Sequence, residues 1–240
     1  MIISKQSDTK HKYQIIKLLT AVLDNEYISQ FIAFKGGTCA EMSGFLDRFS
    51  IDLDFDIRKV IDKNKFQLFI NKIADNLNLK TQNKDVESLF YSFKYEAPEN
   101  QRNTLKISFY ENPPKSNDYE FRFLPDVNRL VNCQTLETMF ANKLVAPIDR
   151  FNRHKKVVGR DIYDIYYFFS QGYHFKPEII EERTGLKTND YLKKLTGFIE
   201  DHLTDKVISE DLSTLLPYNK FNKIRRILKK EVLIYLHASI

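Results

Sequence analysis

Three aspartates occupy alternate positions in residues 50–57, which read Ser-Ile-Asp-Leu-Asp-Phe-Asp-Ile. Alternate residues of a β-strand share a face, so Asp52, Asp54 and Asp56 would project together while the apolar residues between them enter a core. Aspartate is depleted in strands, and neighbouring carboxylates repel one another unless a cation lies between them. Carboxylate oxygens suit Mg²⁺, so the pattern favours a metal site; the alternative is a solvent-exposed polar strand face.

The chain has only seven glycines, and two of them, Gly36 and Gly37, are adjacent. They follow the apolar residues 31–34 and precede Thr38, a pattern that predicts a buried strand, a tight turn and a helix capped by Thr38 that runs through Met42 toward Leu46. Such a turn offers backbone N–H groups and a favourable helix dipole to a phosphate. A phosphate-binding turn followed by a metal-binding strand suggests a nucleoside triphosphate as ligand.

The elements that must position these residues follow from apolar periodicity. Helical spacing predicts helices over residues 13–26 and 65–77, and aromatic or branched residues predict an antiparallel pair of strands at 89–95 and 105–110, with a further strand at 119–124. From Gln134 onward the pattern is helical. We therefore expect an α+β fold, with a mixed sheet flanked by helices in residues 1–130 and a helical C-terminal region, residues 131–240, that contributes to the active site.

Composition excludes several classes of function. The 240 residues carry 37 Lys and Arg against 32 Asp and Glu, a formal net charge of +5 that is compatible with a nucleic-acid partner without requiring one. No apolar run is long enough to cross a membrane, and residues 1–12 are polar, so we expect a cytoplasmic protein without a membrane partner. Cys39 and Cys133 are expected to be reduced and structural. Scattered histidines and the absence of a nucleophile motif argue against a hydrolase.

Three motifs, the first of which has two parts, resemble one known family when taken in order. Gly-Gly-Thr at 36–38 precedes Arg-Phe-Ser-Ile-Asp-Leu-Asp at 48–54, then Leu-Glu-Thr-Met-Phe-Ala-Asn-Lys-Leu at 136–144, then Gly-Arg-Asp-Ile-Tyr-Asp-Ile-Tyr at 159–166. This series is similar to the glycine turn, the paired aspartates, the lysine-bearing helix and the Arg-Asp segment of the AbiEii/AbiGii toxins, a family of nucleotidyltransferase-fold toxins that includes MenT-like proteins. The resemblance spans residues 35–166.

The resemblance implies a nucleotidyltransferase fold and the transfer of a nucleoside monophosphate from an NTP to an acceptor. Asp52 and Asp54 would bind Mg²⁺ or Mn²⁺, and Lys143 would neutralise phosphate charge. One of Asp161 and Asp164 would complete the catalytic site, with Asp161 preferred, while the other would orient Arg160 or Lys143. The residues expected to contact the nucleotide are Gly36, Gly37, Thr38, Arg48, Ser50 and Lys143.

The resemblance also implies partners and a biological role. The acceptor would be tRNA or another RNA, although a protein or small molecule stays open, and a cognate antitoxin protein would be a partner. The role would be that of the toxin in a toxin–antitoxin or phage-defence system. A dense basic stretch, from Arg150 to Arg160, is expected to be a loop that either holds RNA or is simply solvated. A second basic cluster, from Lys220 to Lys230, is expected on a surface helix.

One position departs from the expected pattern. Nucleotidyltransferases commonly use a third carboxylate from a later strand, and Ser108 stands where we would expect it. Asp56, Glu111 or Asp161 would be the substitutes. The alternative is a catalytically silent module of the same fold that binds nucleotide or RNA. An antibiotic-modifying nucleotidyltransferase is a third hypothesis, but the basic stretch argues against a pocket for a cationic drug.

Overall fold

The computed structural model describes residues 5, 8–85, 87–99 and 101–240, so part of the polar N-terminal segment, residues 1–4 and 6–7, lies outside the described residues. The chain divides into two units. The first unit comprises residues 1–44, 49–113 and 119–134, and the second comprises residues 45–48, 114–118 and 135–240. Each unit is therefore built from stretches of chain that are not contiguous in sequence.

The first unit contains a seven-stranded sheet of order β3-β4-β5-β2-β1-β7-β6. Strands β1 and β7 and strands β2 and β5 pair in parallel, whereas the other neighbours are antiparallel, so the sheet is mixed as expected. Its strands are β1 (Ile32–Lys35), β2 (Asp52–Ile57), β3 (Lys80–Asp85), β4 (Phe90–Lys94), β5 (Thr104–Tyr110), β6 (Tyr119–Leu124) and β7 (Arg129–Gln134). Its helices are α1 (Thr9–Leu23), α2 (Glu26–Ser29), α3 (Gly36–Met42) and α4 (Lys63–Asn76).

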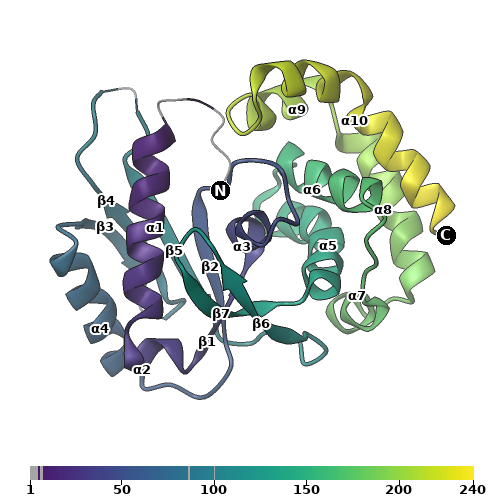
Figure 1. Ribbon diagram of the computed structural model, residues 1–240. Coiled ribbons are helices and arrows are strands. Elements are labelled where there is room, and N and C mark those ends of the chain that lie inside the picture. Colours follow the sequence, from purple (N-terminus) through teal and green to yellow (C-terminus); the bar gives the residue numbers. More distant parts are fainter. Residues whose placement is uncertain (1–4, 6–7, 86, 100) are drawn as a thin grey trace. The chain divides into compact units, whose positions relative to one another are not determined.

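Apolar side chains at alternate positions of the central strands form the core of the first unit. Phe34 of β1, Phe55 of β2 and Phe109 of β5 are buried, and the rings of Phe55 and Phe109 stack with centroids 5.2 Å apart. Helices α1 and α4 lie on one face of this sheet (Figure 1), and Phe66 of α4 packs its ring edge-on against Phe109 at 4.9 Å. Because this face of β2 is apolar, the residues between, Asp52 and Asp54, lie on the other face.

The strands predicted at residues 50–57, 89–95, 105–110 and 119–124 are confirmed, including the antiparallel pairing of β4 with β5. Strands β3 and β7 were not predicted. Every residue of β3 is exposed and none is apolar, so its sequence has no periodicity from which a strand could be predicted. The helix expected after the glycine turn is also different: α3 begins at Gly36, its N-cap is Lys35 rather than Thr38, and it ends at Met42.

The second unit is helical, as predicted for the C-terminal region. Its helices are α5 (Leu136–His154), α6 (Gly159–Ser170), α7 (Pro177–Thr184), α8 (Thr188–His202), α9 (Asp205–Leu212) and α10 (Tyr218–Ala238). The side chain of Thr135 caps α5 by accepting a hydrogen bond from the N–H of Thr138. None of the helices in the described part of the chain has the length and apolar character needed to span a membrane.

The prediction of a basic loop between residues 150 and 160 is largely wrong. Arg150, Arg153 and His154 belong to the last turns of α5, which ends at His154 and is followed by the C-cap residue Lys155, with φ of 52°. Arg160 lies in the first turn of α6, so only a short connection separates the two helices. The periodicity was obscured because polar and basic residues dominate the end of α5.

Candidate active site

The glycine turn and Asp54 lie directly beside each other in the first unit. Gly36 has φ of +79°, a left-handed conformation that glycine adopts without steric cost. A Cβ atom at this position would lie 2.7 Å from Oδ2 of Asp54, which is inside van der Waals contact. A glycine at position 36 therefore gives the turn its shape and leaves room for the Asp54 carboxylate.

Thr38 is fully buried and its hydroxyl is used within the protein. It donates to the backbone carbonyl of Asp52 at 2.5 Å, and its oxygen lies 3.0 Å from Oγ of Ser50. These contacts join the first turn of α3 to the beginning of β2. In this conformation Thr38 and Ser50, both expected to contact a nucleotide, instead fix the carboxylate-bearing strand relative to the glycine turn.

The three aspartates of β2 have different surroundings. Asp52 and Asp54 are half-buried, whereas Asp56 is fully buried. Asp56 accepts hydrogen bonds from Lys35 Nζ at 2.6 Å, Tyr119 Oη at 2.8 Å and Gln134 Nε2 at 2.7 Å. Its carboxylate is thus surrounded by donors from β1, β6 and β7, and it links strands rather than facing a ligand.

Ser108 occupies the place on β5 that the sequence suggested for a third acid. It lies opposite Asp54 in the parallel pairing of β2 with β5. Its hydroxyl donates to Oδ1 of Asp54 at 2.6 Å. One oxygen of Asp54 is therefore held by Ser108 and the other adjoins the glycine turn, so the carboxylate has a fixed orientation.

The oxygen atoms on this face of the sheet fit a hard divalent cation. Mg²⁺ is typically held by one or two carboxylates, while water and substrate phosphates complete its octahedron. Asp52 and Asp54 supply two such carboxylates from alternate positions of one strand. Among the described residues, no group of three or more acidic, histidine or cysteine side chains is placed to hold a metal ion.

In the second unit, Arg48 and Lys143 converge on one carboxylate. Arg48 donates to Asp164 through Nε at 2.5 Å and through Nη2 at 2.8 Å, and Lys143 Nζ lies 2.6 Å from Oδ2 of the same residue. Asp164 is fully buried, which alone would raise its pKa, but the charges of Arg48 and Lys143 prevail and its pKa is lowered. Asp164 is ionised and orients both cations.

The side chains of Arg48 and Lys143 differ in solvent exposure. The side chain of Arg48 is only 4% exposed, so in this conformation it serves mainly as the partner of Asp164. Lys143 is 16% exposed and its ammonium has three N–H donors, so it can pair with Asp164 and still offer a donor to an anion. Of these two expected nucleotide contacts, the geometry favours Lys143.

Asp161 is placed differently from Asp164. It is buried, and Oδ2 accepts a hydrogen bond from Nε of Arg150 at 2.7 Å. Sequence reasoning left open which of the two acids orients Lys143, and the structure brings Asp164, not Asp161, to that lysine. Asp161 instead fixes Arg150, the first basic residue of the stretch that was expected to hold RNA.

One contact of the second unit was not anticipated from the sequence. Tyr163 is buried and donates to Oδ1 of Asp47 at 2.6 Å, and Lys220 also pairs with Asp47. Burial, together with the negative charge of Asp47, raises the pKa of the Tyr163 hydroxyl. Lys220 belongs to the C-terminal basic cluster, so at least one lysine of that cluster forms an intramolecular ion pair. No local pattern marks this contact, because Asp47 and Tyr163 are 116 residues apart.

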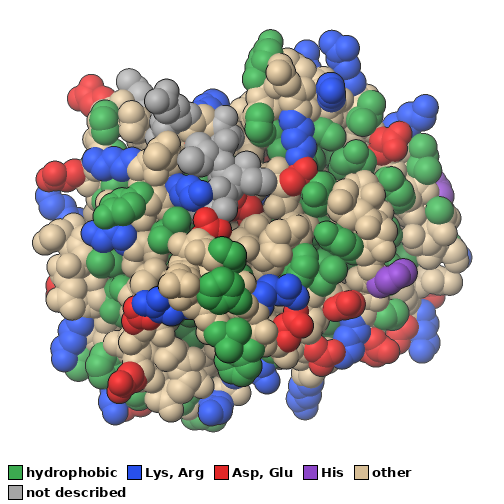
Figure 2. Space-filling model, viewed as in Figure 1, with side chains coloured by type: hydrophobic (Ala, Val, Ile, Leu, Met, Phe, Trp, Pro, Cys, Tyr) green, Lys and Arg blue, Asp and Glu red, His purple; other side chains and the backbone are tan. Residues whose placement is uncertain are grey.

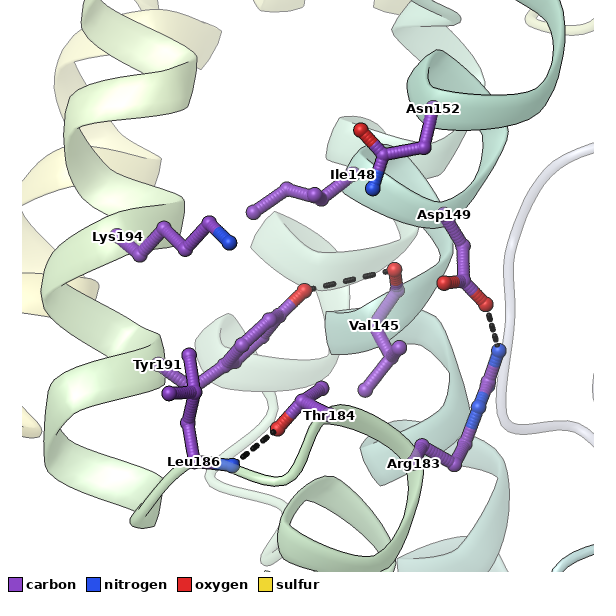
Figure 3. Close-up of a pocket in the computed structure, with 9 residues that line it drawn as sticks. All are labelled: Val145, Ile148, Asp149, Asn152, Arg183, Thr184, Leu186, Tyr191 and Lys194. Atoms are coloured by element: carbon purple, nitrogen blue, oxygen red, sulfur yellow. Dashed lines mark hydrogen bonds and ion pairs between the residues drawn. The ribbon is translucent and has the colours of Figure 1, made fainter.

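A separate small pocket lies among α5, α7 and α8 (Figure 3). Its cavity volume is about 150 Å³, below the several hundred cubic ångströms of typical ligand pockets. Arg183 on its wall pairs with Asp149, and the hydroxyl of Tyr191 donates to the carbonyl of Leu144 at 3.1 Å. None of the expected site residues lines this pocket, and it is too small for a nucleotide.

On the face of the described structure shown in Figure 2, surface charge does not single out a nucleic-acid interface. On the face shown in Figure 2, Lys and Arg side chains are interspersed with Asp and Glu. In the basic stretch, Arg150 pairs with Asp161 and Arg153 with Asp149. This surface matches the mild net charge of +5 more than a dedicated phosphate-binding stripe.

The fold and its carboxylate-bearing strand define the class of protein, and solved structures of similar fold agree. JHP933 from Helicobacter pylori has 20% sequence identity and a TM-score of 0.58, with 99% of this chain and 93% of that chain covered. A putative nucleotidyltransferase from H. pylori has 21% identity and a TM-score of 0.58, covering 98% and 95%. MenT4, a nucleotidyltransferase toxin from Mycobacterium tuberculosis, has 14% identity and a TM-score of 0.53, covering 96% and 84%. This chain therefore has a nucleotidyltransferase-like fold.

The family follows from the sequence. Residues 17–223 match the family described as nucleotidyl transferase AbiEii toxin, type IV TA system. No curated protein matches the chain. The match covers most of the chain, so this protein belongs to the AbiEii family of toxin nucleotidyltransferases, and the predicted family and fold class are confirmed.

Proposed function

We propose that this protein is a metal-dependent nucleotidyltransferase that moves a nucleoside monophosphate from an NTP to an acceptor and releases pyrophosphate. The observation that carries the proposal is the position of Asp54. Its carboxylate lies between the Gly36 turn and the Ser108 hydroxyl, two residues along β2 from Asp52. Transfer from a triphosphate requires a turn that can accept phosphate and neighbouring carboxylates, and here the carboxylate of Asp54 has a fixed orientation.

Asp52 and Asp54 would hold Mg²⁺ or Mn²⁺. Bound there, the ion would supply Lewis-acid polarisation of phosphate oxygens and offset the charge that develops on pyrophosphate. The absence of a side chain at Gly36 leaves room for the Asp54 carboxylate. Ser108 and the glycine turn hold the Asp54 carboxylate in one orientation, so little reorganisation is needed when substrate arrives.

Lys143 would neutralise phosphate charge, and Asp164 would position it. The side chain of Lys143 would otherwise have considerable rotational freedom, and the ion pair with Asp164 restricts it. Arg48 contributes by pairing with the same carboxylate, so that Asp164 stays ionised. In this proposal Lys143 is a catalytic residue and Asp164 and Arg48 are positioning residues.

The proposal does not require a third carboxylate. Asp56 is fully used by Lys35, Tyr119 and Gln134, and Glu111 pairs with Lys63 at 2.7 Å. Phosphoryl transfer depends mainly on positioning and charge neutralisation, with little covalent chemistry left for the protein. Ser108 in the place of an acid is therefore compatible with transfer.

For the biological context, we infer a toxin that acts with a cognate antitoxin in the cytoplasm, in toxin–antitoxin or phage-defence systems. RNA, and tRNA in particular, is the acceptor that we would test first. Membership of the AbiEii toxin family and the likeness to the MenT4 toxin support the toxin role.

The test is transfer of label. The purified protein is incubated with Mg²⁺, total bacterial RNA and each α-labelled NTP in turn, beside Asp54→Asn and Lys143→Ala. We expect label to enter an acceptor, and each substitution to lower the rate by roughly a hundredfold to a thousandfold, as loss of one charge-stabilising group commonly does. Asp201→Asn, at an exposed position of α8, is the matched carboxylate control and should retain full activity.

The silent nucleotide-binding module remains the second candidate, and the observation that favours it is Ser108. It predicts no label in RNA, protein or small molecules with any NTP, while NTP still raises the thermal midpoint of the wild-type protein and not that of Asp54→Asn. That combination would replace transfer by binding as the function. If labelling needs Asp54 and Lys143, the silent module is ruled out.

A further inference from the structure

The two edges of the sheet are of different kinds. Strand β3 at one edge is exposed, carries Lys80 and Lys84, and has an irregular register between Thr81 and Asn83. Lysines and bulges are common protection against unwanted pairing of an edge strand. Strand β6 at the other edge has the sequence Tyr-Glu-Phe-Arg-Phe-Leu, without lysine, proline or a bulge. Only β6 has the features of an edge open to pairing.

The β6–β7 register shows which backbone groups of β6 point away from β7. Beside this hairpin, the N–H of Thr135 donates to the carbonyl of Asp118 at 3.1 Å, in the register that places Tyr119 opposite Gln134. Hydrogen-bonding direction alternates along an antiparallel strand, so the next residues whose backbone N–H and C=O groups point toward β7 are Glu120 and Arg122. The N–H and C=O groups of Tyr119, Phe121 and Phe123 therefore point away from β7, and among the described residues β6 pairs with no other strand.

The side chains of the same segment expose an unusual apolar surface. Phe121 is 71% exposed, Phe123 is 56% exposed, and Leu130, opposite Phe123 on β7, is 66% exposed. These three side chains share one face of the hairpin. Figure 2 shows hydrophobic side chains at the surface in the area that β6 and β7 occupy in Figure 1. Contiguous exposed apolar patches usually mark an interface.

We propose that β6 pairs antiparallel with β6 of a second copy of this chain, centred on Phe121, so that two sheets become one. In this register Phe121 lies opposite the partner's Phe121, and Tyr119 lies opposite the partner's Phe123. The outward-pointing groups of these residues exchange backbone hydrogen bonds, because facing residues of this kind form the hydrogen-bonded pairs of an antiparallel ladder. The exposed aromatic rings become cross-strand pairs.

Charge selects this register and this partner. Centred on Phe121, Glu120 lies opposite the partner's Arg122, and the two-fold axis repeats the pair. Within one chain Glu120 and Arg122 already form an ion pair, which the second copy would complete as a cluster of alternating charge. Moving the centre by one residue in either direction places glutamate against glutamate or arginine against arginine, which is unfavourable. The strand is thus complementary to itself in one register.

The test is the mass of the protein in solution as a function of concentration, by sedimentation velocity or light scattering. We expect a shift from 28.4 kDa to twice that mass between roughly 1 and 200 µM, the affinity of a small interface. Arg122→Glu, and separately Glu120→Arg, should raise the dissociation constant about a hundredfold or more, because each places like charges opposite each other twice. The double variant Glu120→Arg/Arg122→Glu should restore the dimer.

Two further variants keep the test independent of folding defects. Phe121→Pro removes an N–H that points away from β7, so the hairpin should persist, as checked by circular dichroism, while the dimer is lost. Lys84→Glu, a charge reversal on the β3 edge, should leave the dimer unchanged. A monomer over the whole concentration range would overturn the proposal, as would a dimer that is unaffected by Arg122→Glu and Phe121→Pro.

Discussion

At the residue scale, the candidate residues of each unit are held in place by contacts with neighbouring side chains of the same unit. Gly36 leaves space for Asp54, Ser108 fixes one oxygen of that carboxylate, and Asp164 fixes Lys143. A substitution in such a set acts on its neighbour. Matched controls are therefore needed to separate the loss of a contact from a general loss of stability.

Gly36→Ala should be more harmful than Gly44→Ala. The two glycines have nearly equal φ, +79° and +78°, so both substitutions incur a left-handed backbone cost of about 1–2 kcal/mol. Only at Gly36 would the new Cβ meet Asp54 Oδ2, at 2.7 Å, whereas nothing lies within 4 Å at Gly44. We expect Gly36→Ala alone to abolish labelling and to have the lower free energy of unfolding, measured in urea. If Gly36→Ala and Gly44→Ala changed labelling and the free energy of unfolding equally, Asp54 would not be displaced by the new Cβ.

Asp164→Asn should destabilise the protein by about 3 kcal/mol at neutral pH, because it leaves buried Arg48 without its anionic partner. The folded-state pKa of Asp164 is lowered, so its contribution is complete above the unfolded value of 3.8 and is lost as the pH falls below it. The difference in unfolding free energy between wild type and variant should therefore narrow below about pH 3.8. A difference that stays constant down to pH 2 would contradict the ion pair.

At the element scale, β2 shows both what sequence reasoning can predict and where it ends. Strict alternation predicted the strand and the shared face of Asp52, Asp54 and Asp56, and the structure has both. It did not predict that Asp56 would be buried among donors, because those donors come from three other strands whose order is not visible in local sequence. Exposed β3 was missed because it lacks apolar residues, and Ser108 could be placed only by its expected strand register.

Asp56→Ala should lower the free energy of unfolding by about 3 kcal/mol, because it leaves Lys35 and two polar groups without their shared acceptor. The readout is urea unfolding followed by circular dichroism. Asp75→Ala, at an exposed position of α4, is the control and should change stability by less than about 0.5 kcal/mol. A small effect at Asp56 would mean that water replaces the lost carboxylate.

At the scale of the whole molecule, the fold should not depend on the metal that we propose for the reaction. Strand β2 is held by pairing on both sides and by the aromatic core behind it. A metal held by two carboxylates and by substrate contributes little to such a fold, in contrast to a small zinc domain. Family membership and the α+β architecture were predictable from sequence motifs and apolar periodicity. The arrangement of ion pairs was not, because partners such as Arg48 and Asp164 are 116 residues apart.

A chelator should abolish labelling and leave the thermal midpoint within about 2 °C of its original value, since few folding interactions involve the metal site. Adding Mg²⁺ together with NTP should then restore activity and raise the midpoint, as ligand binding to the folded state does. Calorimetry with and without chelator provides the measurement. Unfolding on chelation would show instead that a metal is part of the structure.

The division of the chain into interleaved stretches also bears on how the protein is made. Arg48 and Asp164 are 116 residues apart, so at ribosomal speed the guanidinium emerges roughly 6 to 23 seconds before its carboxylate. During that interval Arg48 must stay hydrated, because a buried charge without a partner is costly. The bridge that orients Lys143 therefore closes late in synthesis, and a nascent chain has its carboxylate strand before it has its positioned lysine.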